Sequence, residues 1–179
     1  MMILITGGSK CGKSALGERL LSSWKLSIFY IATMIPYGEE AHEAIARHRA
    51  MRKNKGFVTV ERYTDIGGLT LPVEKSEKKC AALLECMGNL CANEMFEAAS
   101  PDPCGRILAG IRAFSRRVAH LIIITNQVGS DGIAYPEATM RYIENLGSLN
   151  AELAEMADCV IECVYGIPVP LKGGLPTCL

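Results

Sequence analysis

The chain has 179 residues, and its 19 lysines and arginines balance its 19 aspartates and glutamates, so the formal net charge is zero. A neutral chain lacks the positive field that holds a nucleic-acid backbone, which argues against general DNA or RNA binding. Hydrophobic residues make up 49% and charged residues 21%, a composition that can bury a core and that excludes disorder as a description of the whole.

Nothing in the sequence points to a membrane or to secretion. No apolar run approaches the roughly 20 residues that a membrane-spanning helix needs. Residues 1–7 lack the basic region and the long apolar region of a secretion signal. We therefore expect a cytoplasmic protein without a membrane span.

The cysteines are numerous for this length, and their spacing bears on whether they form disulfides, bind metal or remain thiols. They stand at positions 11, 80, 86, 91, 104, 159, 163 and 178. No pair has the CxxC spacing, and the pairs 86/91 and 159/163 do not repeat a metal-hairpin spacing. The three histidines, at 42, 48 and 120, are also scattered. In a reducing compartment, with mostly apolar neighbours, buried structural thiols are the expected state.

Short apolar runs recur along the chain and predict β-strands. The first run, Met2–Thr6, ends in two glycines, after which apolar residues return at helical spacing. Further runs lie at 28–32, 57–60, 81–84, 121–124 and 159–161, and helical patterns fill 39–53, 87–98, 106–119 and 136–157. Continuously apolar strands that alternate with helices predict a mostly parallel sheet between two helical layers, a three-layer α/β fold. The breaks at 67–68 and 100–103 read as surface turns, so we expect one domain over residues 1–179.

The segment between the first strand and the first helix matches the phosphate-loop motif G-x-x-x-x-G-K-[ST]. It consists of Gly7, Gly8, Ser9, Lys10, Cys11, Gly12, Lys13 and Ser14. Glycines let the backbone curl so that its N–H groups point at phosphate oxygens, and the helix N-terminus adds its positive end. Lys13 supplies a catalytic point charge, and Ser14 supplies a hydroxyl for Mg²⁺. The alternative is a glycine-rich turn without a ligand, and the placement between strand and helix argues against it.

A phosphate-loop site also needs an acid near its metal ion, usually at the end of a neighbouring strand. Glu85 follows the apolar run at 81–84 and is the best candidate for a direct or water-mediated Mg²⁺ contact. A solvated carboxylate at a strand end is the alternative.

The predicted helix at 39–53 carries a histidine among basic residues. His48 and Arg52 are four residues apart and therefore share one helical face. A neighbouring cation favours the neutral, nucleophilic form of imidazole, and a guanidinium group can bind phosphate oxygens. A solvated basic helix face is an equal alternative on these residues alone. His42 and His120 are expected at the surface or at the edge of the core.

Taken in order, these segments resemble one family, the bifunctional adenosylcobinamide kinase/adenosylcobinamide-phosphate guanylyltransferases of cobalamin assembly. The family's phosphate loop is similar to residues 7–14, its second-strand signature to 30–33, and its histidine segment to 45–52. Further similar stretches lie at 58–61, at 83–86 with Asn93, at 125–129, and at 147–150 followed by 157–158. Each stretch except the phosphate loop is weak alone, but the collinear set is specific and runs nearly end to end.

The resemblance implies a RecA-like P-loop NTPase fold and a Mg²⁺-dependent enzyme with two activities. ATP or GTP would phosphorylate adenosylcobinamide, and GTP would then donate GMP through a guanylyl-histidine to give adenosylcobinamide-GDP. His48 stands at the position of the histidine that accepts GMP. The positions that match guanine-nucleotide contacts are Ala32, Thr33, Met34, Arg49, Ala50, Met51, Arg52, Glu61 and Glu85. Family members are homotrimers, so the resemblance also implies a homotrimer that binds a corrinoid and a nucleotide.

The chain departs from the family pattern at a few positions. Gln127 replaces a usual glutamate, Ser130-Asp131 lengthens a turn by one residue, Lys53 replaces a common proline and Phe57 replaces a common tryptophan. The amide at Gln127 predicts a loss of activity in whichever step uses that loop. A different hypothesis is therefore a non-catalytic GTP-binding relative that acts as a sensor or subunit. A third is an unrelated small-molecule P-loop kinase, which would have no use for His48.

Overall fold

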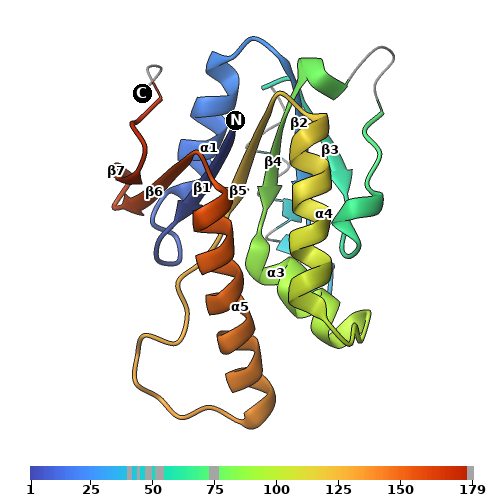
Figure 1. Ribbon diagram of the computed structural model, residues 1–179, viewed down its shortest axis with the longest axis vertical. Coiled ribbons are helices and arrows are strands. Elements are labelled where there is room, and N and C mark those ends of the chain that lie inside the picture. Colours follow the sequence, from blue (N-terminus) through green and yellow to red (C-terminus); the bar gives the residue numbers. More distant parts are fainter. Residues whose placement is uncertain (40–41, 44, 47–49, 51–54, 73–76, 177–179) are drawn as a thin grey trace.

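The computed structural model of the protein describes residues 1–39, 42–43, 45–46, 50, 55–72 and 77–176. Its sheet has seven strands in the order β3-β2-β4-β5-β1-β6-β7 (Figure 1). The strands are β1 (Met2–Thr6), β2 (Ser27–Ala32), β3 (Phe57–Glu61), β4 (Cys80–Glu85), β5 (His120–Ile124), β6 (Cys159–Val164) and β7 (Ile167–Lys172). Every pairing is parallel except that of β6 with β7. The apolar runs of the sequence therefore form the parallel strands β1 to β6, as predicted.

Helices cover both faces of this sheet. They are α1 (Lys13–Ser23), α3 (Met87–Ala92), α4 (Pro103–Arg117) and α5 (Glu137–Met156), with short 3₁₀ turns η1 (Ile66–Gly68) and η2 (Glu77–Lys79) and a π-helical turn η3 (Asn93–Glu97). Buried residues of α3, α4 and α5 share one core cluster with the sheet, and those of α1 share a separate one. The predicted three-layer arrangement is confirmed.

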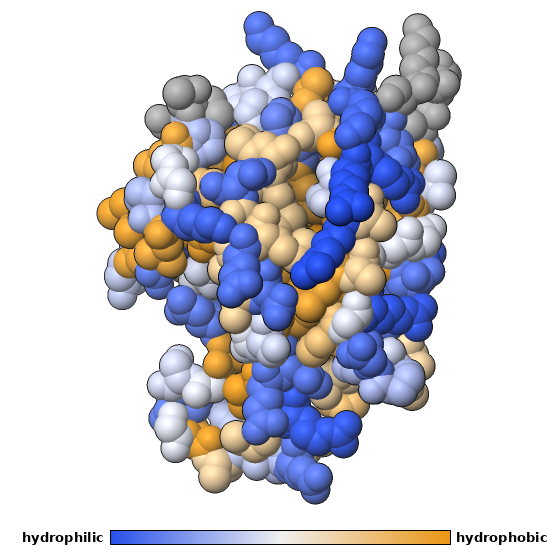
Figure 2. All heavy atoms as spheres, in the orientation of Figure 1, coloured by the Kyte–Doolittle hydropathy of each residue, from blue (hydrophilic) through white to orange (hydrophobic). Residues whose placement is uncertain are grey.

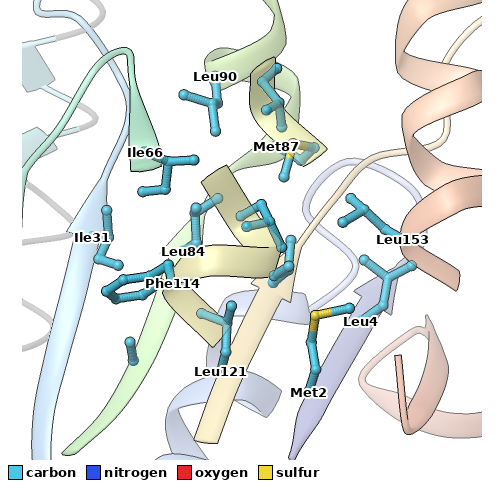
Figure 3. Packing of buried hydrophobic residues seen from close by; sticks show 14 of the residues in the cluster. Met2, Leu4, Ile31, Ile66, Leu84, Met87, Leu90, Phe114, Leu121 and Leu153 are labelled. Atoms are coloured by element: carbon cyan, nitrogen blue, oxygen red, sulfur yellow. The ribbon is translucent and has the colours of Figure 1, made fainter. Parts of the chain in front are cut away.

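The central strand β1 shows why the strands are continuously apolar. Met2 and Leu4 belong to the cluster under α3, α4 and α5, whereas Ile3 and Ile5 belong to the cluster under α1. Figure 3 shows Met2 and Leu4 facing Leu153 of α5 in the first cluster. Because successive side chains of a strand point to opposite faces, a strand covered on both faces needs apolar residues at every position.

Two elements differ from the sequence prediction. β7 was not expected because Pro168 and Pro170 interrupt its apolar residues, and each proline lacks a backbone donor. The strand nevertheless forms at the edge of the sheet, where proline is tolerated. Helix α4 begins at Pro103 and not at the predicted residue 106, because the Asp102 side chain caps it by accepting a hydrogen bond from the Gly105 N–H at 2.9 Å.

The predicted helix at 39–53 falls partly outside the described residues. The positions within it that the structure describes are helical. His48, Arg49, Met51 and Arg52 lie outside the described residues. In the part of the chain that the structure describes, no helix combines the length and apolar character needed to span a membrane.

Candidate nucleotide site

The phosphate loop connects β1 to α1 at the carboxyl edge of the sheet (Figure 1). Gly7 has φ +138°, and a Cβ there would lie 2.6 Å from the Cys163 carbonyl oxygen, so only glycine fits. Gly12 has φ +103° and is the N-cap residue of α1. The two glycines therefore let the chain curl tightly between strand and helix, as the motif predicts.

Lys13 is the buried charge of this loop. Lys13 is only 6% exposed, and its Nζ donates hydrogen bonds to the carbonyl oxygens of Gly7 at 3.0 Å and Gly8 at 2.5 Å. Gly8, Ser9 and Lys10 are exposed. The loop therefore holds the ammonium group within its own curve, where a point charge can reach a bound phosphate.

Ser14 and Glu85 meet beside the loop, although 71 residues separate them in the chain. The Ser14 hydroxyl donates a hydrogen bond to Oε1 of Glu85, and the Tyr30 hydroxyl donates to Oε2 at 2.7 Å. Glu85 ends β4, next to β2, which carries Tyr30. The structure thus brings together the hydroxyl and the acid that the sequence assigned to Mg²⁺. Oxygen ligands of this kind suit Mg²⁺, whose remaining positions are usually filled by water and substrate phosphates.

Tyr30 is a site residue that sequence reasoning missed. The sequence analysis placed it only in the second-strand signature, yet Tyr30 is a buried residue whose hydroxyl holds the Glu85 carboxylate by a hydrogen bond. A tyrosine inside an otherwise apolar buried strand is the signal that could have found it, because its hydroxyl must have a partner.

The loops after β2, β3 and β4 are held together by buried polar side chains. Thr33 is fully buried, and its Oγ1 donates to the Cys86 carbonyl oxygen and accepts from the Cys86 N–H, both at 2.8 Å. Nδ2 of Asn93 donates to the carbonyl oxygens of Thr33 and Tyr63, both at 2.8 Å. The side chain of Thr33 thus positions the backbone immediately after Glu85. The contact of Thr33 with a nucleotide stays a prediction.

The other predicted nucleotide contacts lie along the same edge. Ala32 ends β2 and pairs with both Glu61 and Glu85, which end the strands on either side. Met34 is half-buried, and Glu61 is exposed and accepts a hydrogen bond from the Tyr63 hydroxyl at 2.9 Å. Ala50 is exposed on the helix that follows β2 in the chain. Strand register therefore aligns Ala32, Glu61 and Glu85, which are far apart in sequence.

Gln127 lies on the loop that follows β5. Its Nε2 is 3.4 Å from Oε1 of Glu162 on β6. The same loop is fixed to α5, because the Thr125 hydroxyl donates to Oδ1 of Asn150 at 2.6 Å and Nδ2 of Asn150 donates to the Asn126 carbonyl oxygen at 3.1 Å. A carboxylate therefore still stands beside the position where the family usually has glutamate.

The cysteines that the structure describes are free thiols, and all are buried or half-buried. Burial raises the pKa of the Cys86 thiol and raises that of Cys91 to about 12. Burial and the neighbouring Cys11 thiol raise the pKa of Cys163. Among the described residues, no cluster of three or more histidine, cysteine or acidic side chains could hold a metal ion. The burial of these thiols expected from the sequence is thus observed, in full or in part, for the described cysteines.

Comparison with known proteins identifies the family. Residues 3–171 match the family described as cobinamide kinase / cobinamide phosphate guanyltransferase. The chain belongs to this family. It is 31% identical over 173 residues to the bifunctional adenosylcobalamin biosynthesis protein CobP of Pseudomonas aeruginosa, covering 97% of this chain and 98% of that protein. It is 30% identical over 186 residues to the bifunctional adenosylcobalamin biosynthesis protein CobU of Escherichia coli K12, covering 96% and 100%.

Solved structures support the fold of this family member. A protein from Pyrococcus horikoshii OT3 matches with a TM-score of 0.54 at 9% identity and covers 98% of this chain and 87% of that one. A prototypical ATPase of a bacterial type III secretion system matches with the same TM-score of 0.54 at 13% identity, covering 94% of this chain and 56% of that one. The α/β fold with a mostly parallel sheet, expected from the sequence, is thus confirmed.

Proposed function

We propose that this protein phosphorylates adenosylcobinamide with ATP or GTP and then transfers GMP from GTP to the product, giving adenosylcobinamide-GDP. The family match over residues 3–171 supports both activities. The observation that carries the proposal is the contact between the Ser14 hydroxyl and the Glu85 carboxylate at the mouth of a phosphate loop that encloses Lys13. This arrangement serves a nucleoside triphosphate, and a bare structural turn would not need it.

In the kinase step, the hydroxyl of adenosylcobinamide attacks the γ-phosphorus and the bond to the β-phosphate oxygen breaks. The nucleoside diphosphate leaves, and the hydroxyl proton is released to solvent. Lys13 exchanges its bonds to the loop carbonyls for bonds to phosphate oxygens and offsets their growing charge. Loop N–H groups hold the phosphates in line. Ser14 and Glu85 would hold Mg²⁺, which neutralises charge on the phosphate oxygens when it is bound. Tyr30 keeps the Glu85 carboxylate turned toward Ser14.

In the guanylyl step, a ring nitrogen of His48 attacks the α-phosphorus of GTP and pyrophosphate leaves. A phosphate oxygen of adenosylcobinamide phosphate then attacks the same phosphorus, the P–N bond breaks and His48 is restored. Dividing a difficult displacement in this way is the advantage of covalent catalysis. We assign the guanine nucleotide to Ala32, Thr33, Met34, Arg49, Ala50, Met51, Arg52, Glu61 and Glu85. The alignment of Ala32, Glu61 and Glu85 along one sheet edge supports this assignment.

We also propose that the protein assembles as a homotrimer. The edge strand β7 exposes Ile167, Val169 and Leu171, and Leu171 is 58% exposed. In Figure 2, hydrophobic residues gather at the left margin, where Figure 1 places β6 and β7. An apolar edge strand of this kind is typical of a surface covered by another chain. Light scattering after size exclusion tests the proposal, and a monomer at micromolar concentration would refute it.

Two measurements on the wild-type protein test the proposed function. Incubation with ATP, Mg²⁺ and adenosylcobinamide should yield adenosylcobinamide phosphate. Intact mass after incubation with GTP and Mg²⁺ should increase by one GMP. Binding of GTP with unchanged mass and no corrinoid turnover would favour the non-catalytic alternative. The non-catalytic alternative depends on the loss of a carboxylate at Gln127. Because Glu162 places a carboxylate beside Gln127, we favour a catalytic protein.

A further inference from the structure

The turn between β6 and β7 rests directly on the phosphate loop. Val164 and Ile167 pair as the last and first residues of their strands, so Tyr165 and Gly166 form a two-residue turn. The Gly166 N–H donates a hydrogen bond to the Cys11 carbonyl oxygen at 2.7 Å. A Cβ placed on Gly12 would lie 3.2 Å from the Cα of Gly166. The turn therefore forms one wall of the loop that is proposed to bind phosphate.

Tyr165 stands on this wall with its ring in solvent. It is 94% exposed, the highest value among the large hydrophobic side chains of the described residues. Its φ is +50°, a left-handed conformation in which asparagine and glycine are the usual residues of a two-residue turn. Neither burial within this chain nor turn geometry therefore accounts for a tyrosine at this position. A large aromatic ring next to a phosphate loop instead suits a ligand that carries both phosphate and an aromatic base.

The position of the turn relative to Glu85 indicates how a nucleoside triphosphate would be oriented in the loop. In the sheet, β5 and β4 lie on one side of β1, and β6 and β7 lie on the other. Ser14 and Glu85 mark the β4 side as the place of the terminal phosphate and its metal ion. A triphosphate that starts there and follows the loop leads its nucleoside away from β4, toward the turn that carries Tyr165.

We propose that the ring of Tyr165 stacks on the purine base of the nucleoside triphosphate that donates the phosphoryl group. This inference rests on the proposed kinase activity and adds to it the residue that holds the base. Stacking uses the face of the base and does not read its hydrogen-bonding edge, so adenine and guanine are both accepted. Tyr165 is thus a binding residue that makes the kinase step tolerant of ATP and GTP.

The test separates the base from the phosphates by comparing ATP and GTP with inorganic tripolyphosphate, which has no base. Their dissociation constants are measured calorimetrically with Mg²⁺ for the wild type, Tyr165→Asn, Tyr165→Phe and Phe96→Asn. Asparagine tolerates the left-handed conformation and preserves the turn while removing the ring. Phe96, 53% exposed on η3, provides a control for the loss of an exposed aromatic ring elsewhere.

Tyr165→Asn should weaken ATP and GTP binding about tenfold and leave tripolyphosphate binding unchanged, whereas Tyr165→Phe and Phe96→Asn should bind as the wild type does. Wild-type affinity of Tyr165→Asn for ATP would overturn the proposal, and so would an equal loss for ATP and tripolyphosphate, which would mean that the residue only shapes the loop. If the wild type bound neither ATP nor tripolyphosphate, the proposed kinase site itself would be wrong, and stacking would fall with it.

A spectroscopic measurement reports on the contact itself. Tyr165→Trp adds an indole at the turn, and stacking on a purine should quench its emission. We expect quenching by ATP and by GTP but not by tripolyphosphate, with wild-type Trp24 providing the background signal. Equal emission with and without ATP, under conditions where calorimetry shows binding, would overturn the stacking contact.

Discussion

Replacement of Thr33 by valine should destabilise the protein, because the hydroxyl of the fully buried Thr33 accepts a hydrogen bond from the Cys86 N–H and donates one to the Cys86 carbonyl oxygen. Valine has nearly the same shape but cannot donate or accept a hydrogen bond. The Cys86 N–H left unpaired costs about 1–3 kcal/mol. The Cys86 carbonyl oxygen keeps the hydrogen bond from the Leu90 N–H at 3.2 Å and loses only the one from Thr33, at a cost of about 0.5–1.5 kcal/mol, while the additional methyl group returns about 0.8 kcal/mol. We expect the free energy of unfolding to fall by about 2 kcal/mol, which for a chain of this size lowers Tm by about 4–8 °C.

Urea denaturation followed by circular dichroism measures this loss for Thr33→Val. Thr33→Ser is the matched control, because it keeps the hydroxyl and loses one methyl group, at a cost of about 1 kcal/mol. A valine variant within 0.5 kcal/mol of the wild type, on the order of the scatter of surface substitutions, would refute the structural role given to the hydroxyl. Such a result would leave nucleotide binding as the remaining role predicted for Thr33.

Three further predictions concern charge. Lys13→Ala should abolish kinase turnover and weaken ATP binding, because water cannot replace a buried point charge on the phosphates; near-normal turnover would contradict the phosphate-loop assignment. The sequence alone predicts that Gln127→Glu raises turnover, but in the structure the new carboxylate would stand beside Glu162, so we expect this variant to lower turnover and the addition of Glu162→Gln to restore it. Equal turnover of the single and double variants would show that the two positions do not interact. Burial and the N-terminal ammonium group lower the pKa of His120, so the unfolded chain binds more protons below about pH 6.5 and stability falls as the pH drops from 7 to 5. Tm measured across that range should fall less steeply for His120→Gln, and an unchanged slope would exclude this contribution.

The sequence predicted the features of the fold that depend on local pattern. Six apolar runs predicted the parallel strands β1 to β6, and the phosphate-loop motif predicted the turn from β1 to α1. The edge strand β7 was not predicted, because proline argues against a strand. Pro168 and Pro170 are tolerated only because β7 lies at the edge of the sheet. The start of α4 at Pro103 was not predicted, because it depends on the hydrogen bond that the Asp102 side chain accepts from the Gly105 N–H. The pattern of apolar residues does not show this contact.

The site was predictable where strand ends and motifs specified it, and not where distant side chains meet. Glu85 was expected beside Ser14 because an acid at a strand end is part of phosphate-loop chemistry. Tyr30 could not be assigned to Glu85 without the register of β2 on β4. In the same way, nothing local links Gln127 to Glu162, which are 35 residues apart and meet only because β5 and β6 both flank β1.

Labelling with GTP that carries radioactive phosphorus at the α-position tests the central claim most directly, because the two proposed activities attack different phosphorus atoms. The wild-type protein should acquire a label that is lost in acid and retained in base, as expected of a phosphoramidate on histidine and not of a serine phosphoester. His48→Ala should take up no label and lose guanylyl transfer while it still phosphorylates adenosylcobinamide. A labelled His48→Ala protein would assign the nucleophile to another residue, with His42 the first candidate, and loss of both activities together would contradict the separate roles of His48 and the phosphate loop.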